Sequence, residues 1–132
     1  MNLTATMPWI AAAGLLVFAL VVSVGEISRR RGAWLLPAGL SMLFLGWSLI
    51  AIVNEGLLGF WTEHTRNFWG NQIWFDLLFA LGIGWYLIVP RAKAVGMNPL
   101  PWLVLVLSTG CIGFLAMTAR LVFLEEKSFR KS

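Results

Sequence analysis

The segment IWFDLLFALGIGWYLIVP, residues 73–90, decides the fold class of this chain. It contains a single charged residue, Asp76, and it ends at Pro90, directly before Arg91 and Lys93. A helix that crosses a bilayer needs about 20 consecutive, mostly apolar residues, and few other structures use such a run. The segment therefore predicts a transmembrane helix that carries one anomalous carboxylate.

Three further apolar runs of similar length occupy residues 7–26, 33–54 and 99–123. The segment between the second and third spans, residues 55–72, mixes aromatic and polar side chains. It is too polar to cross a bilayer and too aromatic for a solvated loop, so we expect it to lie in the membrane interface. The pattern predicts an all-α membrane protein: one transmembrane domain over residues 1–132, built as a four-transmembrane-helix bundle with short loops.

The composition agrees with a membrane protein. Of 132 residues, 59% are hydrophobic and 12% are charged, whereas soluble domains are about 45–50% apolar and about 25% charged. This excludes an ordinary soluble domain, a disordered chain and a nucleic-acid-binding domain. The chain has one cysteine and one histidine, so we expect no disulfide within it, no metal site built from these residues and no cofactor.

The distribution of basic residues predicts an orientation. Five basic residues lie in the two loops at 29–31 and 91–93, against Arg66 alone in the central loop. Basic loops face the cytoplasm, which places both termini outside the bacterial inner (plasma) membrane. The basic residues of the tail, Lys127, Arg130 and Lys131, count against this placement.

Small residues indicate where helices pack. Lipid removes most of the hydrophobic drive between spans, so close contact at small side chains must hold them together. We expect such contacts at Ala80, Gly82 and Gly84 of the third span, at Gly110 and Gly113 of the fourth, and at Gly39 and Gly46 of the second. Ala80 and Gly84 share one helix face, as do Gly39 and Gly46.

Polar residues gather near one predicted membrane face: Asp76, Arg120, Glu55, Asn54 and His64. A carboxylate inside a span is costly and needs a partner. One hypothesis is a binding or acid–base site open to the outer leaflet. The other, which we favour, is a structural ion pair between Asp76 and Arg120 that joins the last two spans.

Residues 69–120 resemble a family of small bacterial integral membrane proteins of unknown function. The resemblance consists of an Asp early in a span (Asp76), a basic turn with glycine (Arg91, Lys93, Gly96), and a last span with Gly113 that ends in Arg120. It implies that Asp76 and Arg120 matter together. The chain is also similar to integral-membrane terpene cyclases, which protonate a polyene or epoxide with a Glu and an Asp from separate spans. Glu55 and Asp76 would be their counterparts here, in a dimer.

These patterns favour a non-enzymatic function. We expect a small integral membrane protein that acts by lateral association with a membrane protein or lipid partner. Its partners would be the lipid bilayer and a homo-oligomer or larger membrane complex, with no nucleic acid. The alternative is a membrane enzyme or carrier for a lipophilic, isoprenoid-like substrate, with Asp76 and Glu55 as catalytic residues.

Overall fold

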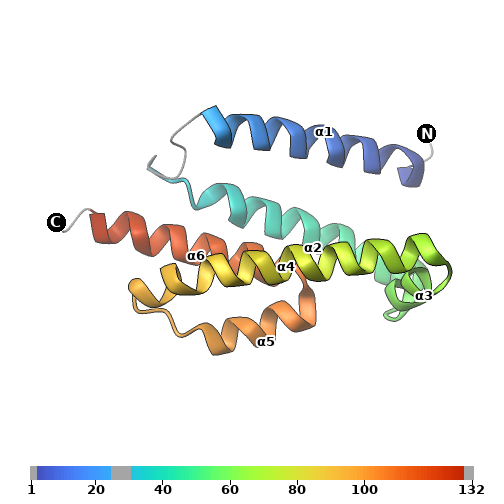
Figure 1. Cartoon of the computed structure of the whole chain (residues 1–132). Coiled ribbons are helices and arrows are strands. Elements are labelled where there is room, and N and C mark those ends of the chain that lie inside the picture. The colour runs from blue at the N-terminus through green and yellow to red at the C-terminus, as the bar shows by residue number, and fades with distance from the viewer. Residues whose placement is uncertain (1–2, 25–30, 130–132) are drawn as a thin grey trace. The chain divides into compact units, whose positions relative to one another are not determined.

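The computed structural model describes residues 3–24 and 31–129, which are almost entirely helical (Figure 1). The helices are α1 (Leu3–Val24), α2 (Leu35–Glu55), α3 (Gly59–Thr65), α4 (Phe68–Ala94), α5 (Pro99–Thr109) and α6 (Cys111–Phe129). The end of the first predicted span and the basic residues Arg29, Arg30, Arg130 and Lys131 lie outside the described residues. The predicted helical bundle is confirmed at the level of an all-helical architecture.

Three of these helices, α1, α2 and α4, are long and apolar enough to cross a membrane. At 1.5 Å per residue, the 21 residues of α2 span about 31 Å, which matches the hydrocarbon core of a bilayer. The helix α4 has 27 residues and extends past both ends of the span predicted at 73–90. The side chain of Asn67 caps it by accepting a hydrogen bond from the Gly70 N–H at 2.8 Å.

The described chain divides into two compact units. The first contains α1, whose central residues are apolar on every side and exposed within the unit. Ser23, near the end of α1, donates its hydroxyl to the Ala19 carbonyl at 2.7 Å, so its polar group is satisfied within the helix. The second unit begins at Trp34 and contains α2 to α6. The prediction of one transmembrane domain over the whole chain stays a prediction.

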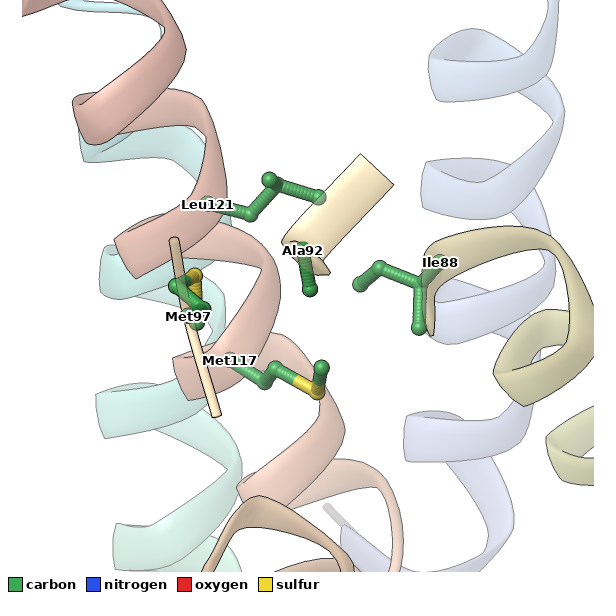
Figure 2. Close-up of a cluster of buried hydrophobic side chains, with 5 residues drawn as sticks. All are labelled: Ile88, Ala92, Met97, Met117 and Leu121. Carbon is green, nitrogen blue, oxygen red and sulfur yellow. The ribbon is translucent and has the colours of Figure 1, made fainter. Parts of the chain in front are cut away.

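Within the second unit, α6 is the central helix, because α2, α4 and α5 all pack against it. Met117 and Leu121 of α6 are fully buried and contact Ile88 and Ala92 of α4 (Figure 2). Met97, from the turn between α4 and α5, completes this cluster. The contacts advance in the same direction along both helices, so α4 and α6 run parallel (Figure 1).

The single helix expected over residues 99–123 is wrong. The chain stops being helical at Gly110 and turns back, so α5 and α6 form an antiparallel hairpin (Figure 1). Gly110 has φ 60° and ψ −127°, a combination that a residue with a Cβ rarely adopts. The uncharged sequence 94–119 thus supplies a short helix, a turn and the first half of another helix.

The turn at Gly110 satisfies its own polar groups. The Thr109 hydroxyl donates to the Leu105 carbonyl at 2.7 Å and accepts the Gly113 N–H at 3.0 Å. From α2, the buried Ser41 hydroxyl donates to the Ile112 carbonyl at 2.9 Å. Backbone groups freed by a break in a membrane helix need such partners, so these hydroxyls explain how the chain can reverse here.

The segment predicted as an interfacial loop, residues 55–72, is mostly helical. It contains α3 and the first residues of α4. The helix α3 packs on the start of α4 so closely that a Cβ added at Gly70 would collide with the Glu63 carbonyl oxygen. Glycine at position 70 is therefore required by this contact, and the segment is an ordered corner of the second unit.

The predicted packing glycines divide into three groups. Gly84 lies against the Phe114 ring, and Gly113 lies against the Leu105 backbone, so both are contact positions. Gly110 makes the turn instead of a helix contact. Gly39, Gly46 and Gly82 have open space around them, and Ala80 is exposed, so these four make no such contact in the second unit.

We predict that Gly84→Leu destabilises the protein and that Gly82→Leu does not. A Cβ at Gly84 would lie 2.8 Å from the Phe114 ring, whereas one at Gly82, two residues away, would meet nothing within 4 Å. Overpacking a tight contact costs about 1–3 kcal/mol. Thermal unfolding in detergent measures the difference. Equal unfolding temperatures of the two variants would contradict the packing of α4 on α6 at this position.

Candidate functional site

The end of the second unit that carries α3 holds three of the predicted site residues. Asn54 and Glu55 are the last two residues of α2, and His64 lies in α3. The Asn54 amide donates to the Ile50 carbonyl of its own helix at 2.7 Å, and the Asn71 amide donates to the His64 backbone carbonyl at 2.6 Å. The structure thus brings these residues to one end, but the Asn54 and Asn71 amides donate to backbone carbonyls and not to the predicted site side chains.

An aromatic cluster holds this end together. The Trp74 ring of α4 lies 4.9 Å from the His64 ring, centroid to centroid, and 6.1 Å and 6.4 Å from the rings of Phe60 and Trp61. These are distances at which aromatic rings attract one another. His64 is half-buried against Trp74, so its ring has a packing role that the sequence interpretation missed.

Asp76 lies two residues beyond Trp74, on the exposed surface of α4. Within residues 3–24 and 31–129, no hydrogen bond or ion pair involves its carboxylate. The residues of α4 that contact α6, Gly84, Ile88 and Ala92, lie on a different side of the helix. Asp76 is therefore directed away from the core of the second unit.

The ion pair predicted between Asp76 and Arg120 is wrong. Because α6 runs parallel to α4, with Leu121 beside Ala92, Arg120 lies near the level of Pro90. The rise of 1.5 Å per residue then separates the levels of Asp76 and Arg120 by roughly 20 Å. Arg120 instead places its guanidinium 5.8 Å from the centre of the Phe123 ring, a cation–π contact. The pair does not form because α6 starts only at Cys111, after the turn at Gly110, and runs parallel to α4, which places Arg120 at the opposite end of the unit.

The structure contains an interhelical ion pair that the sequence interpretation did not identify. Arg91 of α4 binds Glu125 of α6 through two hydrogen bonds, Nε to Oε1 at 3.0 Å and NH2 to Oε2 at 2.8 Å. The two side chains are 53% and 22% exposed. A bidentate pair of this kind fixes two helices in register. Both residues flank apolar segments, but only the hairpin at Gly110 brings them together.

The described acidic and basic residues of the second unit are unequally distributed between its two ends. Arg91, Lys93, Arg120 and Lys127 lie at the end where α4 and α6 terminate, together with Glu125 and Glu126. The half that carries α3 holds Glu55, Glu63 and Asp76 against Arg66, which pairs with Glu63 at 3.3 Å. One end is therefore net basic and the other net acidic.

The surface of the second unit has an open apolar groove along α4. It is lined by residues on one face of that helix: Leu78, Phe79, Gly82, Ile83, Tyr86 and Leu87. A smaller hollow lies between α2 and α6 and is lined by Trp34, Phe123, Glu126 and Lys127. Neither includes Asp76 or Glu55. Among the described residues, no three His, Cys, Asp or Glu side chains are grouped so that they could hold a metal ion.

Comparison of the chain with protein-family models, with curated proteins and with solved structures finds no match. The two resemblances described above, to small bacterial membrane proteins and to terpene cyclases, therefore remain predictions.

We predict that Arg91 and Glu125 are energetically coupled and that Asp76 and Arg120 are not. In a double-mutant cycle, Arg91→Gln and Glu125→Gln should show a coupling of about 0.5–1 kcal/mol, because the pair is bidentate but partly exposed. Asp76→Asn and Arg120→Gln should be additive, since the residues lie at opposite ends. Chemical or thermal unfolding in detergent provides both measurements. A measurable coupling energy between Asp76 and Arg120 would contradict the α5–α6 hairpin, because the hairpin places the two residues far apart.

Proposed function

We propose that this protein is a small integral membrane protein of the bacterial inner membrane that acts by lateral association with a membrane protein or lipid partner. The observation that carries the proposal is the outer face of α4, an apolar helix long enough to span a bilayer. This face has a groove at Gly82 and an unpaired carboxylate at Asp76. Small residues in such grooves let a second helix approach closely.

The membrane-enzyme hypothesis requires Asp76 and Glu55 to border one cavity where a lipophilic substrate could bind. The groove on α4 and the hollow between α2 and α6 include neither residue. An enzyme needs a cavity that encloses its substrate. A helix face that is open along its length is better suited to contact a partner helix or an acyl chain. Association is therefore the better-supported function.

The proposal includes an orientation in the membrane. The net basic end of the second unit, with Arg91, Lys93 and Lys127, faces the cytoplasm, because basic residues flanking spans remain there. In this arrangement α1, α2 and α4 cross the membrane and α5 and α6 form a hairpin that enters and leaves on the cytoplasmic side. The N-terminus is then outside, and the C-terminus is inside instead of outside. The basic tail no longer conflicts with the basic loops.

Cysteine accessibility tests this orientation. In a Cys111→Ala background, Thr65→Cys should react in intact cells with a reagent that cannot cross the membrane. Ala33→Cys and Ser128→Cys should react only after the membrane is opened, because both flank the basic end. Labelling of Ser128→Cys from outside would show that α6 does not return to the cytoplasmic side. Labelling of Ala33→Cys from outside would show that the protein has the opposite orientation in the membrane.

Photo-cross-linking tests the association itself. A photoreactive residue at Tyr86, in the groove of α4, should form an adduct of discrete mass with another membrane component in native membranes. The matched control is Leu107 of α5, because the two side chains are 79% and 78% exposed. We expect no discrete adduct at Leu107. The same mixture of non-specific adducts at both positions would contradict a specific partner at the α4 face.

A further inference from the structure

Asp76 shares a helix face with exposed apolar residues. Phe79, Ile83 and Leu87 follow it at intervals of three, seven and eleven residues, and all three are exposed. Residues at these spacings lie on one side of an α-helix. Phe79, Ile83 and Leu87 also line the groove at Gly82. Asp76 therefore stands at one end of a continuous apolar surface, which we call the α4 outer face.

The depth of Asp76 can be estimated from α4 itself. Between Ile73 and Pro90 it is the one charged residue, and Arg91 follows fifteen residues later. That separation corresponds to about 22 Å along the helix axis. With Arg91 at the inner boundary of a hydrocarbon core about 30 Å thick, Asp76 lies inside the outer leaflet, below the level of headgroups. An ionised carboxylate at this depth needs a counter-charge.

Within the described residues of the second unit, no lysine or arginine supplies that counter-charge. Arg66 is committed to Glu63 at 3.3 Å, and the remaining basic residues of the second unit lie at its opposite end. The residues of α1, Leu3–Val24, include no Lys, Arg or His. Packing of α1 on the α4 outer face would bury Asp76 without neutralising it. A second copy of the chain, related by a twofold axis along the membrane normal, would set one Asp76 against another.

We propose that the α4 outer face binds a transmembrane helix of another protein, and that this helix carries a lysine or arginine in the outer leaflet at the depth of Asp76. The cation pairs with the carboxylate, and the groove at Gly82 receives the apolar part of the helix. A charge-assisted hydrogen bond is strongest where water is excluded, so one such pair supplies the specificity of the contact. This inference rests on the proposed lateral association and adds the chemistry of the partner.

The test uses the full-length chain in lipid vesicles with a designed probe helix. The probe is a 21-residue Leu/Ala span with one Lys about one and a half turns below its outer end. Association is measured by energy transfer between dyes on the two components. The Lys probe should bind about tenfold more tightly than the same helix with Leu at that position. A probe with its Lys at the mirror position in the inner leaflet should bind no better than the Leu probe.

Variants of the chain identify the groups responsible. Asp76→Asn should lower the affinity for the Lys probe to that for the Leu probe, while Asp76→Glu should retain most of the preference. Gly82→Leu, which has open space for its side chain, should weaken binding of both probes. If Asp76→Asn lowered the yield of folded protein, a charge reversal would test the pair instead. The Asp76→Lys variant should bind a probe with Glu in place of Lys more tightly than it binds the Leu probe.

The outcomes separate this inference from the proposed function. Equal affinity of wild type and Asp76→Asn for the Lys probe overturns the inference. A discrete cross-link at Tyr86 would then still support lateral association through apolar packing. A different result overturns both: if Tyr86→Cys forms a disulfide with Leu15→Cys of the same chain in monomers and neither probe binds, α1 of this chain covers the α4 outer face.

Discussion

The reversal of the chain at Gly110 is the constraint on which the rest of the second unit depends. It returns α6 along α5 and places Met117 and Leu121 against α4. In a membrane the hydrophobic effect contributes little to such packing, so the hairpin must be held by close contacts and satisfied polar groups. The contact of Gly84 with Phe114, and the Ser41 hydroxyl bonded to the Ile112 carbonyl, provide both.

The same reversal sorts the charges. Because α6 runs parallel to α4, the basic and acidic residues of its second half meet the end of α4, where Arg91 binds Glu125. Arg120 is carried away from Asp76, which leaves the acidic half of the unit with few cations. One backbone conformation thus forms an ion pair at one end, removes the expected pair from the other, and leaves one end of the unit net basic and the other net acidic.

The two faces of α4 follow from this arrangement. Its inner face packs on α6 through Gly84, Ile88 and Ala92. Its outer face carries Asp76, Phe79 and Tyr86, which are exposed in the second unit. In the proposed association, this outer face with its unpaired carboxylate is the surface that binds another membrane component. The packing of α3 on α4, with the ring contacts of Trp74, holds the start of α4 in place, and Asp76 lies two residues beyond Trp74 in this helix.

Much of the fold was predictable from the sequence. Runs of apolar residues bounded by charges specify α1, α2 and α4, because the length of an uncharged segment is a direct physical requirement for crossing a bilayer. The close contacts at Gly84 and Gly113 also followed from the rule that small residues mark helix packing. The position of Asp76 in a long apolar helix, and its anomaly there, could be seen from the sequence alone.

The tertiary structure alone decided how the last apolar run is used. Residues 94–119 contain no charge, and hydropathy averages over such a segment do not distinguish one long helix from a hairpin. The difference lies in the backbone dihedral angles of Gly110, which a glycine permits but does not impose. The pairing of Arg91 with Glu125, the separation of Asp76 from Arg120, and the end at which α6 terminates all depend on that single conformation, because side chains on two helices meet only when the direction of both is set.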